Sequence, residues 1–145
     1  LNKRMKQDHS LDTRIDEATT RLSRERRDCR LIFDSRMAWH FAEDTFKIFL
    51  TVDPTVAAQR VMANPRDSEE RYRSVEEARD KLVERSRVEQ SRFRELYGVD
   101  YCDYGNYNLV VDSSERTPEE IVDIIWEAFR AYQNDPIANR HIEVL

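Results

Sequence analysis

Glycine is almost absent from this chain, since only Gly98 and Gly105 occur among 145 residues. Cysteine is equally rare. Cys29 and Cys102 lie far from each other and from the three histidines, a spacing that matches no zinc motif and argues against a disulfide framework. No apolar run reaches the length of a membrane span, and no signal-peptide pattern is present. We therefore expect a cytoplasmic protein with reduced cysteines, no metal ligands of its own and no membrane partner.

Lysine is scarce as well, with four lysines against 20 arginines. Acidic residues outnumber basic ones and give a net charge of -5, which argues against a nucleic-acid binder because such proteins need a basic surface. Arginine presents a planar fork of donors that fits carboxylate and phosphate groups. Clustered arginines in this chain are therefore candidates for binding such groups.

Short apolar runs alternate with helical patterns along the chain. Helices are predicted for residues 12–27, 53–64, 74–96 and 117–132, and buried strands for residues 31–33, 46–52 and 108–114. Such alternation is typical of an α/β fold in which helices flank a parallel sheet. We expect a single domain over residues 1–134, interrupted by a mobile polar segment at 65–73, and a loose tail at 135–145.

Capping signals mark the ends of the predicted helices. The N-terminal signals are Asp12, Asp53 with Pro54, Ser74 with Glu77 as a capping box, and Thr117 with Glu120 as a second capping box. Asn64 and Gly98 mark C-terminal ends.

Polar residues follow two of the predicted strands, at the edge where parallel sheets bind ligands. Asp34, Ser35 and Arg36 follow the first strand, and residues 112–114 follow the third. Arg36 is therefore either a ligand-binding residue or one half of an ion pair with a neighbour such as Asp34 or Asp44.

The long helix carries Arg85, Glu89 and Arg92 on one face, because seven residues make about two helical turns. This face is either solvated charge or a phosphate-binding surface, and Arg87 and Arg94 repeat the spacing on another face, so spacing does not decide. The polar segment before the helix favours a helix that moves over a ligand. Such a helix brings positive charge to a transferring phosphoryl group and excludes water.

Several segments, in this order, resemble the cytidylate kinase family of nucleoside monophosphate kinases. "LIFDSRMAW" resembles the strand and Gly-Arg turn of that family, although Ser35 stands where the family has glycine. "TFKIFLTVDPTVAAQRV" is similar to the next strand and helix. The stretch from Ala78 to Ile125 resembles the lid with the closing strand and helix. The resemblance covers residues 12–130 and implies a lid at about residues 65–97.

The resemblance implies a P-loop kinase fold that transfers the γ-phosphoryl group of ATP to CMP or dCMP with Mg²⁺. It implies that Arg36 binds the phosphate of the acceptor and that Arg85 and Arg92 bridge the donor and acceptor phosphates. Glu89 would hold these arginines or the acceptor, and Arg60 would lie near the adenine of ATP.

The phosphate loop of such kinases is missing, because no G-x-x-x-x-G-K-[ST] motif occurs in the chain. We expect this loop, with the family's first strand and helix, to precede Leu1 in a longer chain. Residues 1–145 alone are expected not to phosphorylate CMP. They are also expected to be poorly stable, or to pair as a homodimer or strand-exchanged oligomer, because the sheet would lack an interior strand. Two alternatives stay open: another small-molecule or nucleotide kinase of the same fold, and a non-catalytic binding or assembly module derived from a kinase.

Overall fold

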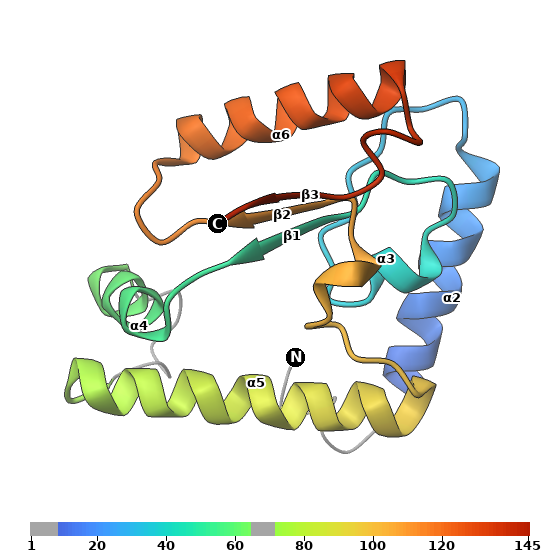
Figure 1. Cartoon of the computed structure of the whole chain (residues 1–145). Helices are drawn as coiled ribbons and strands as arrows, with labels where there is room; N and C mark the ends of the chain where they lie inside the picture. The colour runs from blue at the N-terminus through green and yellow to red at the C-terminus, as the bar shows by residue number, and fades with distance from the viewer. Residues whose placement is uncertain (1–8, 65–71) are drawn as a thin grey trace. The chain divides into compact units, whose positions relative to one another are not determined.

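The computed structural model describes residues 9–64 and 72–145, so residues 65–71 of the expected mobile segment and lid lie outside the described residues. The chain divides into two compact units between Lys47 and Ile48. The first unit contains α2 (His9–Glu25) and α3 (Ala38–Phe41). The second unit contains β1 (Ile48–Thr51), α4 (Pro54–Ala63), α5 (Val75–Tyr97), the 3-10 helix η1 (Tyr104–Asn106), β2 (Leu109–Asp112), α6 (Pro118–Asn134) and β3 (Ile142–Val144) (Figure 1). None of the helices in the described ranges combines the length and apolarity needed to cross a membrane.

The second unit is built on a three-stranded parallel sheet with the order β1-β2-β3. β2 is the central strand, and its residues Leu109, Val110 and Val111 are fully buried. α6 runs alongside the sheet and leads the chain from the end of β2 back to the start of β3 (Figure 1). Parallel strands need a crossover of this kind. The predicted α/β class, with helices around a parallel sheet, is confirmed.

No strand forms at residues 31–33, so the prediction of a buried strand there is wrong. These residues have no regular structure, and Ile32 is 98% exposed. A strand is stabilised by backbone hydrogen bonds to a neighbouring strand. In the described residues the sheet consists of β1, β2 and β3, and residues 31–33 pair with none of these strands.

The prediction of a loose C-terminal tail is wrong as well, because β3 joins the edge of the sheet. Its residues 142–144 pair with 109–111 of β2. The N–H of Ile142 donates to the carbonyl of Asn108 at 2.8 Å, and the amide of Asn108 donates to the carbonyl of Arg140 at 2.9 Å. The His141 ring adds two contacts, one to the carbonyl of Tyr107 and one to Glu143, each at 2.8 Å.

The caps of α4 and α6 form as predicted. Oδ1 of Asp53 accepts hydrogen bonds from the N–H groups of Thr55 and Val56 at the start of α4. Thr117 and Glu120 make a reciprocal capping box at the start of α6. These local signals define the two helices that follow β1 and β2 and therefore flank the carboxyl ends of both strands.

α5 also begins and ends where the sequence indicates, with one difference. Ser74 Oγ accepts the N–H of Glu77 at 3.1 Å. The carboxylate of Glu77 accepts the N–H of Arg73 at 2.9 Å, so the expected capping box with Ser74 is only half formed. Gly98 ends the helix in the left-handed conformation, with φ of 68°.

α2 forms close to its predicted position, but its buried face is polar. The helix begins before Asp12, so Asp12 lies inside it and is not its N-cap. Its buried residues share one face and are polar: Asp12, Asp16, Thr19 and Ser23. Ile15 and Leu22, whose helical spacing with Ala18 had predicted this helix, are 41% and 42% exposed. The spacing of the apolar residues therefore predicted the helix correctly but not the face that it buries.

Candidate functional site

Arg36 lies in the first unit on a turn that is anchored on both sides. Before it, the hydroxyl of Ser35 accepts the N–H of Met37 at 3.2 Å. After it, Met37 is only 2% exposed and leads directly into α3. Arg36 itself is exposed. The buried Met37 next to it fixes the backbone of this turn at the position of Arg36.

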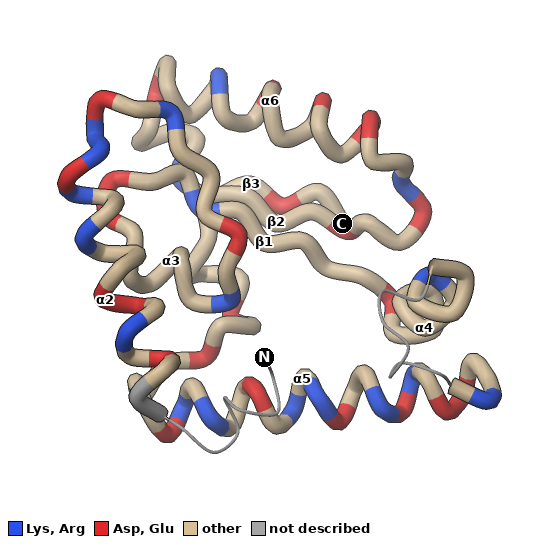
Figure 2. The backbone as a smooth tube through the Cα atoms, turned by 180° about the vertical axis from the view of Figure 1, so that it is seen from behind, with Lys and Arg blue, Asp and Glu red and all other residues tan. Residues whose placement is uncertain are grey.

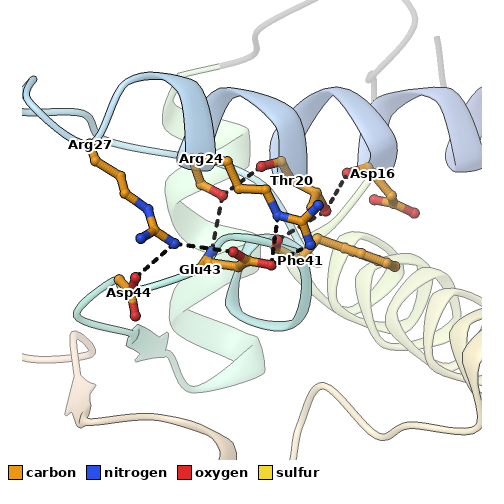
Figure 3. A network of polar contacts seen from close by, with 8 residues as sticks. Asp16, Thr20, Arg24, Arg27, Phe41, Glu43 and Asp44 are labelled. Carbon is orange, nitrogen blue, oxygen red and sulfur yellow. Dashed lines mark hydrogen bonds and ion pairs between the residues drawn. The ribbon is translucent and has the colours of Figure 1, made fainter.

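Polar side chains of α2 hold the segment that follows α3 (Figure 3). Thr20 Oγ1 donates to the carbonyl of Phe41 at 3.0 Å, and the N–H of Glu43 donates to Ser23 Oγ at 3.1 Å. Arg24 binds the carboxylate of Glu43 at 2.6 Å. This hydrogen bond lowers the pKa of Glu43 below its ordinary value. The polar buried face of α2 therefore serves to dock the segment that contains Arg36 and α3.

The carboxylate of Asp44, one of the predicted ion-pair partners of Arg36, is bound by a different arginine. Arg27 Nη2 lies 3.1 Å from Asp44 Oδ2 (Figure 3). Asp44 also has a positive φ of 51°, a conformation that is typical of tight turns. The structure thus gives Asp44 a role in the turn.

Three charged residues of α5, which we call the arginine face, are Arg85, Glu89 and Arg92. Arg85 Nε lies 3.8 Å from Glu89 Oε1, and the side chain of Glu89 is only 14% exposed. The guanidinium carbon of Arg92 lies 4.8 Å from the ring centroid of the buried Phe93, a cation–π contact. A largely buried carboxylate beside two arginines differs from a freely solvated charge pattern.

The other arginines of α5 have different surroundings, although basic and acidic residues alternate along the whole helix (Figure 2). Arg87 is 76% exposed and lies 3.3 Å from Glu84. Arg94 Nη2 lies 2.9 Å from Asp100 Oδ2, in the loop that follows the helix. Arg87 is therefore a surface residue, and Arg94 connects α5 to a loop. Spacing alone did not separate them from the arginine face, but their contacts do.

Arg60 reaches from α4 to the end of β2. Its Nη2 donates to the carbonyl of Ser113 at 2.6 Å and to that of Ser114 at 3.1 Å. These carbonyls belong to the loop beyond the carboxyl end of the sheet, where ligands bind in parallel α/β folds. The guanidinium group therefore fixes this loop at the carboxyl edge of the sheet.

The carboxyl ends of β1 and β2 are tied together by the same loop. Ser113 donates to the carbonyl of Thr51 from both its N–H and its hydroxyl, each at 2.8 Å. The hydroxyl of Ser114 donates to Asp112 Oδ1 at 2.6 Å and accepts the N–H of Asp53 at 2.8 Å. Hydrogen bonds from Ser114 lower the pKa of Asp112, so this carboxylate stays ionised at neutral pH. The result is a rigid, hydrogen-bonded polar edge at the carboxyl ends of β1 and β2.

A family model described as the cytidylate kinase-like family matches residues 1–115. The chain belongs to this family. It is 31% identical over 137 residues to a cytidylate kinase of Natronomonas pharaonis, which covers 93% of this chain and 67% of the relative. It is 33% identical over 104 residues to a cytidylate kinase of Methanothermobacter thermautotrophicus, with 72% and 60% covered.

A third relative has a different name. An S-adenosylmethionine-dependent nucleotide dehydratase of Lacinutrix mariniflava is 29% identical over 140 residues, which are 91% of this chain but 27% of the dehydratase. The chain therefore spans between 27% and 67% of the length of these three relatives. No solved structure matches the chain.

For this member of the cytidylate kinase-like family, the second unit contains four of the five predicted site residues. The three residues of the arginine face lie on α5, and Arg60 lies on α4, which packs near the beginning of α5 (Figures 1 and 2). Arg36 lies in the first unit. The roles of these residues in binding nucleotides stay predictions.

Sequence reasoning missed the residues that hold the candidate site in place. Asp100, Thr20 and Ser23 were not selected, although each binds a segment next to a predicted site residue. Their contacts with these segments join residues 6 to 21 positions apart, so no local pattern indicates them. A buried polar stripe at helical spacing, as on α2, is the only sequence signal that could have drawn attention to two of them.

Mg²⁺, which the family resemblance implies, has no protein-built site in the described ranges 9–64 and 72–145. No group of three or more His, Cys, Asp or Glu side chains is placed there to hold a metal ion. The described residues therefore do not fit a dedicated magnesium site, and their chemistry is that of arginine and carboxylate groups.

Proposed function

We propose that the protein handles a cytidine monophosphate, CMP or dCMP, as the acceptor of the γ-phosphoryl group of ATP. In this reaction the bond between the γ-phosphorus and the bridging oxygen of ATP breaks, and a phosphate oxygen of CMP forms a bond to that phosphorus. The products are ADP and CDP. The observation that carries the proposal is membership of the cytidylate kinase-like family over residues 1–115.

The arrangement of the charged residues supports this chemistry. Arg36, exposed between anchored neighbours, would bind the phosphate of the acceptor. Arg85 and Arg92 would stabilise the negative charge that spreads over the transferring group, because phosphoryl transfer depends mainly on positioning and electrostatics. Glu89, largely buried beside Arg85, would hold the arginines in place. Arg60, which reaches from α4 to the loop beyond the sheet, would lie near the adenine of ATP.

We further propose that the 145 residues supply the acceptor side and the lid, whereas a phosphate loop has to be supplied by additional sequence. We propose this division of roles because the sequence of the 145 residues contains no phosphate-loop motif. On this proposal the 145-residue chain binds CMP but does not transfer phosphate. The protein would act in the cytoplasm, where ATP and CMP are available.

Titration calorimetry of the 145-residue chain with CMP, dCMP, AMP, UMP and shikimate tests the proposed acceptor. Binding of CMP and dCMP in preference to the other three compounds is expected. The same chain mixed with ATP, Mg²⁺ and CMP is expected to form no CDP. Preference for AMP, UMP or shikimate would overturn the choice of acceptor in favour of another kinase of the same fold. CDP formation would overturn the proposal that the phosphate loop has to be supplied by additional sequence.

The similarity to the nucleotide dehydratase favours a second candidate function. In that relative the matching region is about a quarter of the protein. A kinase-derived module could bind a nucleotide, or assemble with another protein, without catalysing transfer. A chain carrying a phosphate loop that binds CMP but forms no CDP in the presence of ATP would support this module. CDP formation by that chain would exclude it.

The free edge of β1 supports the proposal that two copies associate. In the described residues β1 pairs only with β2, and Ile48 and Leu50 on its surface are 37% and 49% exposed. Unpaired strand edges with apolar side chains promote pairing with another chain. Sedimentation velocity is expected to detect a dimer, and a monomer at all concentrations would contradict this part.

A further inference from the structure

Three polar side chains of α5, which we call the loop stripe, contact the loop after the helix. They are Ser86, Gln90 and Arg94, spaced four residues apart and therefore on one helical face. Ser86 Oγ lies 3.3 Å from the hydroxyl of Tyr101. Gln90 Nε2 donates to Asp100 Oδ1 at 2.8 Å, and Arg94 Nη2 donates to Asp100 Oδ2 at 2.9 Å.

Asp100 is the centre of these contacts. Its Oδ1 also accepts the N–H of Cys102 at 2.9 Å, and its carbonyl accepts the amide of Asn106 at 2.7 Å. The hydrogen bond from Gln90, followed by that from Cys102, lowers the pKa of Asp100 below its ordinary value, so the carboxylate is ionised at neutral pH. One side chain thus binds α5 at two points and the loop at a third.

The loop itself is fixed to the sheet. Tyr101 and Tyr107 are each 5% exposed, and the hydroxyl of Tyr107 donates to the carbonyl of Tyr101 at 2.6 Å. The ring of Tyr107 stacks on Phe49 of β1 with a centroid distance of 4.8 Å. The contacts therefore continue from α5 through Asp100 and the two tyrosines to the strands.

The loop stripe and the arginine face lie on different sides of one helix. Arg85 precedes Ser86 and Glu89 precedes Gln90, while Arg92 lies between Gln90 and Arg94. One residue corresponds to about 100° around an α-helix, so rotation of α5 about its axis moves both surfaces together. Two anchors one turn apart fix this rotation, which a single surface ion pair would not do.

We propose that Asp100 is a positioning residue: by binding Gln90 and Arg94 it sets the rotation of α5 and so directs Arg85, Glu89 and Arg92 toward the nucleotide phosphates. This inference rests on the proposed function for the identity of the ligand. It assigns Asp100 no contact with the nucleotide, and its effect is transmitted through the backbone of α5.

Substitution of Asp100 in the full chain, with a control in the same loop, tests the inference. Asp100→Ala removes the acceptor for both helix contacts, and Asp100→Asn keeps the shape but removes the charge that binds Arg94. The control is Asp103→Ala. Oδ1 of Asp103 accepts the N–H of Gly105 at 2.9 Å, and no hydrogen bond of this side chain within the described residues reaches α5. Hydrogen exchange of the α5 amides and affinities for CMP and cytidine are measured for each variant.

Asp100→Ala is expected to speed amide exchange around residues 86–94 and to weaken CMP binding roughly tenfold, the loss of about one charge-assisted phosphate contact. Cytidine lacks the phosphate, so its affinity is expected to stay the same, whereas general damage to the fold would weaken both ligands. Asp100→Asn is expected to be intermediate, and Asp103→Ala to resemble the unmodified chain.

Unchanged exchange and unchanged CMP affinity in Asp100→Ala would overturn the inference. Equal losses for CMP and cytidine would also overturn it, because they indicate a purely structural role. Failure of the unmodified chain to bind CMP would instead overturn the proposed acceptor. The exchange comparison between Asp100→Ala and Asp103→Ala would then decide whether Asp100 fixes α5.

Discussion

Replacement of Gly98 by alanine isolates the energetic cost of the left-handed turn that ends α5. Gly98 has φ of 68°, and a Cβ atom built on it meets no other heavy atom within 4 Å. Steric overlap therefore contributes nothing, and the whole penalty comes from the backbone. A non-glycine residue in the left-handed region costs roughly 1–2 kcal/mol. The alanine also restricts the unfolded chain, which returns about 0.4–1 kcal/mol.

The expected net effect of Gly98→Ala is a loss of about 1 kcal/mol in the free energy of unfolding. For a chain of this length, such a loss lowers the thermal midpoint by about 4 °C. Urea denaturation followed by circular dichroism measures the free energy, and a thermal scan measures the midpoint. The hydrogen bond from the N–H of Gly98 to the carbonyl of Arg94, at 2.9 Å, is retained by alanine and does not enter the difference.

Gly105→Ala is the matched control, because Gly105 has no positive φ. A Cβ there lies 3.2 Å from Asp103 Oδ1, the end of a flexible side chain that is able to move. Its effect is expected to be within about 0.5 kcal/mol of zero. Equal free energies for the two variants would refute the reasoning, since they would show that the left-handed conformation of Gly98 carries no cost. A loss well above about 2 kcal/mol would show that the turn supports additional structure, including the contacts of Asp100.

Three further predictions concern the arginine face, the edge of the sheet and a helix cap. Arg92→Ala is expected to weaken CMP binding about tenfold and to lower the thermal midpoint by no more than about 4 °C, through loss of the contact with Phe93. Arg87→Ala is expected to change neither quantity. Equal affinities of the two variants in titration calorimetry would contradict the role assigned to Arg92. Hydrogen bonds to the carbonyl of Tyr107 and then to Glu143 raise the pKa of His141, because both partners are acceptors and only the charged ring donates to both. The contribution of the charged His141 ring to stability is fully present below the ordinary pKa of about 6.5. It is lost as pH rises through the raised pKa. As pH rises through that window, the thermal midpoint of His141→Gln is expected to fall less than that of the unmodified chain. Parallel curves of midpoint against pH would refute the link between the charge of His141 and stability. Asp53→Ala is expected to cost about 1 kcal/mol in urea denaturation by removing two hydrogen bonds at the start of α4, and an unchanged midpoint would exclude Asp53 as a cap.

The sequence predicted best those features that depend on a few neighbouring residues. Asp53, Thr117 and Gly98 act at the helix ends as expected, because a cap involves residues within about four positions of one another. Alternation of apolar runs and helical patterns likewise predicted the parallel sheet. The positions of β1 and β2 followed from their apolar character, and the buried residues of β2 agree with a central strand.

Features that depend on distant partners were not predicted. Residues 31–33 have the composition of a strand but no paired neighbour in the described sheet, and β3 forms from a segment whose polar His141 and Glu143 concealed its strand character. The polar face of α2 is buried because Thr20 and Ser23 bind a segment about 20 residues away. In the candidate site, the arginine face was recognised by resemblance, whereas its separation from Arg87 and Arg94 required contacts with Glu84 and Asp100.

The contacts of Asp100 near one end of α5 would make the helix a lever with its fulcrum between Gln90 and Arg94, once the contact of Ser86 with Tyr101 is released. Arg92 lies at the fulcrum and would stay in place when the helix tilts. At a rise of about 1.5 Å per residue, Arg85 lies about 10 Å from Arg92, so a tilt of about 10° moves its backbone by about 2 Å. The same tilt moves the start of the helix at Val75 by about 4 Å. Arg92 would therefore act as a fixed electrostatic contact and Arg85 as an adjustable one, with displacement growing toward the end of α5 that follows residues 65–71.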